Sequence, residues 1–237
     1  MGRSSFSPRS LGAPPQFTEW RAAQLDAIMR FDRTPHSTSL IVAPTGVGKT
    51  LLAWALGAIT GMRTLILTAN RSLQKAYADA LADAGLVDVR GQQNYPCRAI
   101  GPMGHLRQYQ QLSGSGMCDD APCHHGVQCP LVAGGCDYYD AIHTASGAEF
   151  VVTNYAFWIN IGKQLRAGRT KEDPLGKFDL IICDEAHMSA DEVNRALTVE
   201  LSAEAVRSLL GTQLLKEKAK PGEWRKWADR SAVLLRE

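Results

Sequence analysis

The sequence predicts an α/β fold in which a parallel sheet is flanked by helices. Short apolar runs with the composition of strands alternate with segments whose apolar residues recur at helical spacing. This alternation is interrupted by residues 91–140, which are rich in Gly, Cys and Pro and show little periodicity. With 237 residues and 45% hydrophobic content, the chain can form one large domain that carries such an insertion.

The first predicted elements surround a glycine-containing loop. Residues 18–31 repeat apolar positions at helical spacing, behind Thr18, which can cap the start of a helix. Residues 39–43 are an apolar run that predicts a strand, and residues 51–56 begin a second helical pattern. Between strand and helix lies the sequence APTGVGKT, residues 43–50, which matches a relaxed form of the phosphate-loop pattern.

The residue types of this phosphate loop suit the binding of a nucleotide. Two glycines let backbone N–H groups approach phosphate oxygens, and Lys49 supplies positive charge for the β- and γ-phosphates. The hydroxyl of Thr50 is placed for Mg²⁺, and the helix that starts here adds the positive end of its dipole. We expect the following residues to contact the nucleotide: Pro44, Thr45, Gly46, Val47, Gly48, Lys49 and Thr50.

Three later segments continue the α/β pattern. Residues 63–68 predict a strand that leads into a helix at 72–84, and residues 149–153 predict another strand. A further apolar strand, 178–183, runs directly into Asp184-Glu185-Ala186-His187. Such a position lies at the carboxyl edge of a parallel sheet, where α/β proteins bind their ligands. Asp184 can hold a metal and Glu185 can orient or deprotonate a water, so the two motifs together indicate a nucleoside triphosphate hydrolase.

Five of the six cysteines lie within residues 91–140, and the pattern predicts a metal site. They are Cys97, Cys118, Cys123, Cys129 and Cys136. No export signal is present, so we expect a reducing compartment, where disulfides are rare. Zinc would take four thiolates or include His124 or His125, whereas an iron–sulfur cluster would take four thiolates. The absence of a CxxC pair favours the cluster. The sixth cysteine, Cys183, is expected to be a small core residue of its strand.

Composition adds few constraints. The formal net charge of +2 neither requires nor excludes a nucleic-acid partner. No apolar run is long enough to cross a bilayer, so no membrane partner is expected, and we expect a cytoplasmic or nucleoid-associated protein. Residues 1–16 are expected to be a disordered leader and residues 191–237 a helical segment.

These motifs together resemble the iron–sulfur branch of superfamily 2 helicases, the DinG/XPD group. Residues 45–50 resemble motif I, residues 68–74 resemble motif Ia, and residues 184–187 form motif II in its DEAH form. Gln24 is placed like the adenine-recognising glutamine of that family. The cysteine-rich insertion falls between motifs Ia and II, with flanks at 91–97 and 136–141 that are similar to those of the group.

The resemblance implies a RecA-like domain over residues 17–90 and 141–190, with an iron–sulfur insertion over residues 91–140. It implies that a 4Fe–4S cluster is held by Cys97, Cys118, Cys123 and Cys136, with Cys129 as an alternate ligand. It further implies that His187 links the nucleotide to motif III. The residues expected to face a nucleic-acid strand are Thr68, Asn70 and Arg71.

The function implied is that of the N-terminal, ATP-hydrolysing half of an ATP-dependent DNA helicase. ATP and Mg²⁺ would be its cofactors, and single-stranded or forked DNA its partner. Motif III is absent from the sequence, so a second RecA-like domain is expected on a longer chain or a separate subunit. Two alternatives remain open. One is a nucleotide- and DNA-binding module without ATPase activity of its own, and the other is a zinc-stabilised translocase on duplex DNA.

Overall fold

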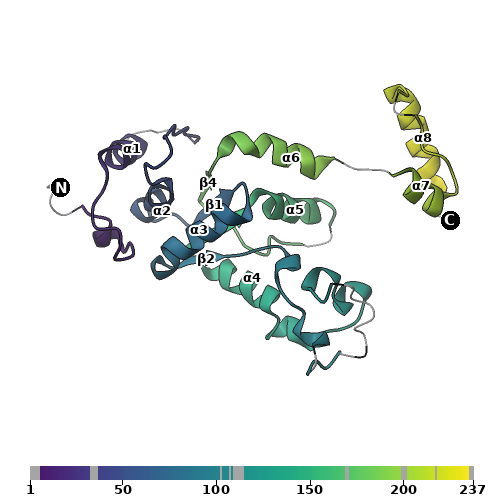
Figure 1. The fold of residues 1–237 in the computed structure, drawn as a ribbon, viewed down its shortest axis with the longest axis horizontal. Coiled ribbons are helices and arrows are strands. Elements are labelled where there is room, and N and C mark those ends of the chain that lie inside the picture. Colours follow the sequence, from purple (N-terminus) through teal and green to yellow (C-terminus); the bar gives the residue numbers. More distant parts are fainter. Residues whose placement is uncertain are drawn as a thin grey trace. The chain divides into compact units, whose positions relative to one another are not determined.

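The computed structural model describes residues 6–32, 37–101, 103–106, 108, 115–168, 171–198, 202–216 and 218–234. The chain divides into two compact units, residues 1–196 and 197–237. The first unit contains the sheet and the predicted motifs, and the second contains two helices (Figure 1).

The first unit is built on a parallel four-stranded sheet with the order β2-β3-β1-β4. Its strands are β1 (Thr64–Thr68), β2 (Leu86–Asp88), β3 (Phe150–Asn154) and β4 (Leu180–Cys183). Because the strands are parallel and in register, Thr68, Asn154 and Cys183 all lie at one carboxyl edge. The sheet therefore has the architecture that the sequence predicts, with the strand before Asp184 at its edge.

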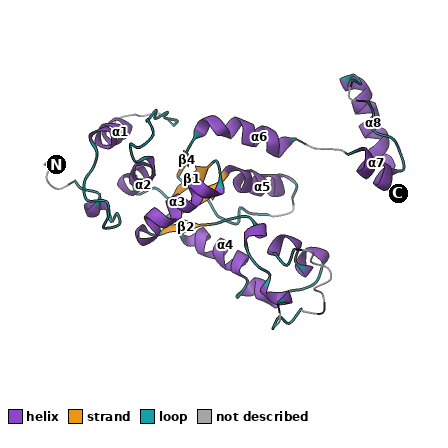
Figure 2. Cartoon of the chain, viewed as in Figure 1, coloured by secondary structure: helices purple, strands orange, loops and turns teal. Residues whose placement is uncertain are grey.

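Helices cover both faces of the sheet, as Figure 2 shows. Side chains on one face, including Ile66 and Val152, pack with α1 (Ala22–Asp32), α2 (Lys49–Thr60) and α3 (Arg71–Leu81). The alternate side chains, including Leu65 and Val151, pack with α4 (Asp137–Gly147) and α5 (Tyr155–Arg166). Strands buried on both faces need continuous apolar sequences, which explains the uninterrupted runs in β1 and β3.

Residues 39–43 do not form the predicted strand. They run as coil, and the side chains of Leu40 and Val42 are 84% and 89% exposed. A strand needs a hydrogen-bonded neighbour, and no described strand pairs with this segment or with the outer edge of β4. The composition of residues 39–43 is suited to a strand, but the described part of the chain contains no strand that forms hydrogen bonds with this segment.

The segment expected to be a disordered leader is ordered from residue 6. A short 3₁₀ helix, η1 (Arg9–Leu11), precedes Ala13, which is buried in the hydrophobic core formed with α1, α2 and α3. The ring of Phe6 stacks on Trp20 at 5.7 Å, and Gln16 Nε2 donates to the carbonyl of Ala80 at 3.0 Å. These contacts fix residues 6–16 against the helical layer that includes α2 and α3, which differs from the expectation. Residues 1–5 lie outside the described part.

The cysteine-rich insertion, hereafter the cysteine module (residues 91–140), consists mainly of short 3₁₀ turns. These are η3 (Gln92–Asn94), η4 (Arg98–Ile100), η6 (Cys118–Asp120), η7 (Pro122–His125) and η8 (Pro130–Ala133). The entry and exit of the module are joined. Arg98 forms an ion pair with Asp137 at the start of α4, with Nε 2.9 Å from Oδ2, and the rings of Tyr95 and Tyr138 meet at 5.7 Å. We call these two contacts the neck of the module.

Arg63, immediately before β1, joins several segments at the amino-terminal edge of the sheet. Its guanidinium donates hydrogen bonds to five main-chain carbonyls, those of Ala145, Ser146, Ala148, Leu175 and Lys177. It also stacks on the ring of Phe178, 4.2 Å from the centroid. The end of α4 and the segment leading to β4 are thereby fixed to the start of β1.

Residues 197–237 form the second unit, which contains α7 (Ala203–Leu210) and α8 (Pro221–Leu234). Val206 and Trp227 are buried, and Trp227 Nε1 donates to the carbonyl of Gln213 at 3.0 Å. The apolar positions of this segment are used in part for packing within the unit. Within the described ranges, no helix is both long enough and apolar enough to cross a bilayer.

We expect Arg63→Met to lower the free energy of unfolding by about 2–4 kcal/mol, because partly buried carbonyls lose their donors while the aliphatic stem is kept. Urea unfolding followed by circular dichroism measures this change. Lys75→Met is the control, because Lys75 makes only an exposed i,i+4 pair with Asp79 and its loss should cost no more than about 0.5 kcal/mol. Equal destabilisation by the two variants would contradict the role given to Arg63.

Candidate functional site

The candidate site lies where the phosphate loop (residues 43–50) meets the segment that follows β4. Helix α2 begins at Lys49, directly after Gly48, and the short turn η9 (Ala186–Met188) follows Glu185. Asp184 N donates to the carbonyl of Leu67 at 2.9 Å, which continues the β1–β4 pairing to the last residue before Glu185. The sheet thus fixes the two carboxylates against the start of α2.

The phosphate loop is held from behind by Arg21 and Gln24. Arg21 Nη1 donates to the carbonyl of Gly46, and Gln24 Nε2 donates to the carbonyl of Gly48 at 3.0 Å. Gln24 Oε1 accepts from the main-chain N–H of Arg21 at 2.9 Å, so both ends of this buried amide are used. The structure therefore places Gln24 against the loop backbone.

Gly48 is required at its position for two reasons. Its φ of +86° is in the left-handed region, which favours glycine, and a Cβ there would lie 2.5 Å from Gln24 Nε2. The amide of Gln24 can approach the loop only because residue 48 has no side chain.

Lys49 and Glu185 form an ion pair across the site. Lys49 Nζ lies 3.2 Å from Glu185 Oε1, and both side chains are about one-third exposed. The other carboxylate oxygen, Oε2, lies 3.4 Å from His187 Nδ1. Glu185 therefore contacts both Lys49, from the phosphate loop, and His187, from its own motif.

Asp184 is held by hydrogen bonds at both its side chain and its main chain. Oδ1 accepts from the main-chain N–H of Glu185 at 3.0 Å, and Oδ2 accepts from the hydroxyl of Tyr77 at 3.0 Å. The carbonyl oxygen of Asp184 accepts from the hydroxyl of Tyr155 at 3.0 Å. Burial, followed by the charge of Asp184, raises the pKa of Tyr77 well above its ordinary value, so Tyr77 is a neutral donor.

The backbone at Glu185 is unusual. Within the described ranges, Glu185 is the one non-glycine residue with a positive φ, at 49°. A left-handed conformation is costly for a residue with a side chain and is often found at functional sites. Here it turns the chain sharply after β4, so that Asp184 and Glu185 both lie close to the start of α2.

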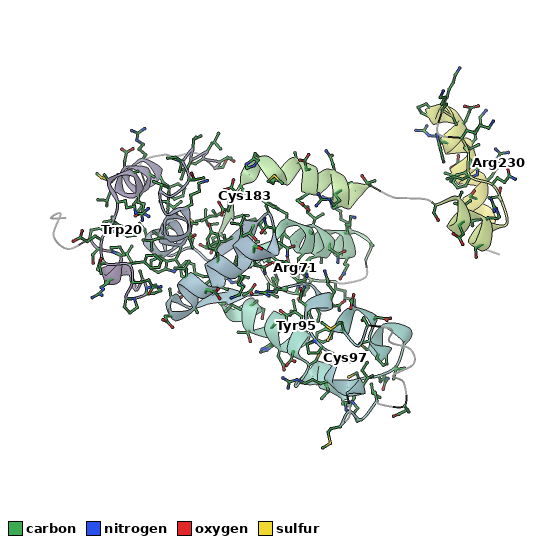
Figure 3. All side chains as sticks on the ribbon, in the orientation of Figure 1. Trp20, Arg71, Tyr95, Cys97, Cys183 and Arg230 are labelled. Atoms are coloured by element: carbon green, nitrogen blue, oxygen red, sulfur yellow. The ribbon has the colours of Figure 1, made fainter. Side chains whose placement is uncertain are left out.

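The three residues expected to face nucleic acid differ in their surroundings. Thr68 is fully buried, and its hydroxyl lies 3.2 Å from the carbonyl of Thr153, so it supports the turn instead of facing solvent. Asn70 caps α3 by accepting from the N–H of Leu73 at 2.9 Å. Arg71, labelled in Figure 3, is exposed at the first position of that helix. Asn70 and Arg71 therefore remain available at the surface.

The fold and site define the class of the protein as a P-loop domain of RecA-like fold. Residues 17–212 match the family model described as type III restriction enzyme, res subunit. The chain belongs to this family, which is a superfamily 2 helicase-like family that binds ATP. No curated protein matches the sequence.

All five cysteines of the cysteine module line one pocket. Its other lining residues are largely apolar or aromatic, and they include Leu131, Val132, Tyr138 and Tyr139. Figure 3 shows Cys97 and Tyr95 in this module. The predicted four ligands and the alternate, Cys129, are thus brought together around the same space. The side chains of His124 and His125, considered as zinc ligands, lie outside the described residues.

Two thiols of this pocket, those of Cys118 and Cys123, have a raised pKa and so favour the protonated form. Burial and the neighbouring thiols raise the pKa of Cys118 to about 12, and burial with the nearby Cys129 raises the pKa of Cys123. A metal site made of these residues would have to release protons on loading. The donor set of clustered sulfurs in an apolar shell fits a thiolate-bound group.

The described residues do not contain three or more His, Cys, Asp or Glu side chains arranged to hold a single metal ion. A shared pocket, and not an ion-binding geometry, is therefore what brings the five cysteines together in the described residues.

Cys183 is exposed, which corrects the expectation that it is a core residue. The reason is the position of β4 at the sheet edge, where alternate residues of the strand are exposed. It lies in β4, outside the set of residues that line the cysteine pocket.

Sequence reasoning missed three residues near these sites. Tyr77 and Tyr155 hold Asp184, and His105 Nε2 lies 4.0 Å from Cys129 Sγ. A signal existed for Tyr77, because a phenol on the buried side of a helix needs a hydrogen-bond partner. The identity of the partner could not be predicted, since Asp184 is remote in sequence.

We expect Gly48→Ala to weaken nucleotide binding roughly 10–100-fold, because the new methyl displaces Gln24 and the loop backbone with it. Gly61→Ala is the matched control. Gly61 ends the same helix with a φ of +63° but has no neighbouring atom within 4 Å of the added Cβ. Both variants carry left-handed strain, but at residue 48 the strain lies within the phosphate loop and the added methyl meets Gln24. Fluorescence titration with a nucleotide analogue compares the two. Equal affinities of the two variants would show that this contact is unimportant.

Proposed function

We propose that this chain is the ATP-binding and ATP-hydrolysing domain of an iron–sulfur DNA helicase of the DinG/XPD type. The observation that carries the proposal is the arrangement of Lys49, Asp184 and Glu185 at the carboxyl edge of the parallel sheet. Hydrolysis would be coupled to movement along DNA or to its unwinding. The family match supports the helicase-like class, and the cysteine module supports the finer assignment.

Lys49 changes partner when ATP binds. Without nucleotide, its ammonium group is neutralised by Glu185. The γ-phosphate brings a greater negative charge to the phosphate loop, so Lys49 turns to the β- and γ-phosphates and releases the carboxylate. Glu185 is then free to accept a hydrogen bond from the attacking water and to take its proton. His187, which lies next to Glu185 Oε2, retains the orientation of that carboxylate.

Thr50 and Asp184 are the residues that would hold Mg²⁺, through the hydroxyl and through a carboxylate oxygen. The bound ion would offset the negative charge on the phosphate oxygens. Gln24 holds the loop in shape. It is also proposed to contact the adenine, for which its amide would exchange one of its present partners, the N–H of Arg21 or the carbonyl of Gly48. The backbone N–H groups of residues 45–50 bind the phosphates.

Asn70 and Arg71 form the proposed contact with a DNA strand. Both are exposed at the amino-terminal end of α3, where main-chain N–H groups and a guanidinium suit phosphate oxygens. Such contacts carry little sequence information, which suits a protein that moves along DNA. We propose that the strand is single-stranded or forked and that a second RecA-like domain completes the track.

The cysteine module is proposed to hold a 4Fe–4S cluster through Cys97, Cys118, Cys123 and Cys136, with Cys129 as the alternate ligand. The cluster would stabilise a module whose own core is small, with Ala99, Ile100 and Leu106 as its buried members. The stabilised module would then form a rigid edge beside the sheet, and such an edge is suited to separating the two strands of DNA.

A second candidate is a zinc-stabilised translocase on duplex DNA. The description of the matched family, a restriction enzyme subunit, favours it. A nucleotide- and DNA-binding module without ATPase activity is the remaining alternative. Metal content separates the first candidate from the second, and turnover separates both from the third.

Lys49→Ala should abolish nucleotide binding, whereas Glu185→Gln should bind nucleotide and lose turnover by roughly 10²–10⁴-fold, because the amide cannot take a proton. Nucleotide binding by fluorescence and phosphate release in the presence of single-stranded DNA measure the two effects. Lys163→Ala, at an exposed position near the end of α5, is the control and should resemble the unmodified protein. Turnover by Glu185→Gln at the unmodified rate would refute the assignment.

Cys136→Ser should remove the cluster and loosen residues 91–140, yet leave nucleotide binding intact, because the described side-chain contacts of the phosphate loop are with Arg21, Gln24 and Glu185, outside the module. Absorbance near 400 nm, with about four irons and inorganic sulfide per chain after anaerobic purification, is the expected signature of the unmodified protein. Cys183→Ser should retain this signature, since Cys183 is exposed and lies outside the pocket. One zinc and no iron would instead support the duplex translocase.

A further inference from the structure

We propose that Tyr77 is a positioning residue for the Mg²⁺ site: its hydroxyl holds the carboxylate of Asp184 in the orientation that binds the metal. The inference rests on the proposed function, because it assigns a role to a residue outside the motifs of that same site. Among the described hydrogen bonds, that of the Tyr77 hydroxyl goes to Asp184, so the role that we assign to Tyr77 is exerted through Asp184.

The geometry around Tyr77 is that of a fixed donor. The residue lies in α3, its side chain is 2% exposed, and it belongs to the core cluster between the sheet and α1–α3. Its ring therefore has little freedom to move, and the hydroxyl meets Asp184 Oδ2 at 3.0 Å. Packing decides where the hydroxyl lies, and the hydroxyl decides the rotation of the carboxylate.

The hydrogen bonds at Asp184 leave room for a metal. Oδ1 accepts one bond, from the N–H of Glu185, and Oδ2 accepts one, from Tyr77. Each oxygen has a further lone pair, so either can bind Mg²⁺ or one of its waters. Since Mg²⁺ requires near-octahedral geometry, a carboxylate that is already oriented binds it with a smaller loss of conformational freedom.

Tyr155 provides a natural comparison. Its hydroxyl also donates to Asp184 at 3.0 Å, but to the main-chain carbonyl and from the opposite face of the sheet. Changing either tyrosine to phenylalanine therefore removes one hydroxyl group that donates a hydrogen bond to Asp184. Only one of them acts on the carboxylate.

The alternative is that Asp184 serves merely as a partner for a buried phenol. In that case the hydroxyl of Tyr77 would contribute to stability and have no effect on metal binding. A measurement of stability alone would not separate the two roles. The dependence of nucleotide binding on Mg²⁺ does separate them, because a purely structural bond leaves it unchanged.

The experiment titrates Mg²⁺ into the unmodified chain, Tyr77→Phe and Tyr155→Phe, each with a fluorescent ATP analogue, and repeats the binding in EDTA. Tyr77→Phe should raise the Mg²⁺ concentration for half-maximal effect about tenfold, the effect typical of groups that orient metal ligands. Its binding of the analogue in EDTA should be unchanged. Tyr155→Phe should shift the Mg²⁺ midpoint by less than about twofold.

The outcomes distinguish the inference from the proposed function. If the unmodified chain shows no nucleotide binding that Lys49→Ala removes, the proposed function fails. If it binds but Tyr77→Phe has the unmodified Mg²⁺ midpoint, or both tyrosine variants shift it equally, the positioning role is refuted. Thermal unfolding of each variant serves as the check on folding. Failure of Tyr77→Phe to fold would assign the bond to stability and would likewise overturn the proposal.

Discussion

The fold depends on how Arg63 closes the amino-terminal edge of the sheet. Five carbonyls from the end of α4 and from the segment before β4 accept hydrogen bonds from one guanidinium. The main chain of Arg63 also pairs with residues 179 and 180, through its carbonyl and the N–H groups of Asp179 and Leu180. A planar fork can satisfy so many acceptors where an ammonium group cannot. Because Arg63 fixes the beginning of β4, Asp184 at the other end of this strand has a defined position beside Leu67.

The candidate site lies at the opposite, carboxyl edge of the sheet, and its residues come from separate layers of the fold. Lys49 comes from α2, the two carboxylates from the end of β4, and the tyrosine hydroxyls from α3 and α5. Asp184 is therefore gripped from both faces of the sheet. The left-handed turn at Glu185 then directs the second carboxylate back toward the phosphate loop. The strain at this turn is maintained because β4 on one side and η9 on the other fix the chain.

The sequence predicts the elements whose signal is local and misses those that depend on distant partners. The apolar runs of β1, β3 and β4 and the periodicity of α1–α3 correspond to observed elements, whereas β2 has only three residues and gave no signal. Residues 39–43 carry the same apolar signal as the true strands, yet composition does not reveal whether a strand edge lies beside them. In the same way, spacing identifies Lys49, Asp184 and Glu185, but it cannot identify Tyr77, whose partner is 107 residues away.

The neck of the cysteine module has a mechanical consequence. Along the chain, the module is entered from β2 and left through α4. The Arg98–Asp137 and Tyr95–Tyr138 contacts hold these two connecting segments together. A force on the module would therefore act on β2 and α4 together. The end of α4 is in turn held by Arg63, which directly precedes β1.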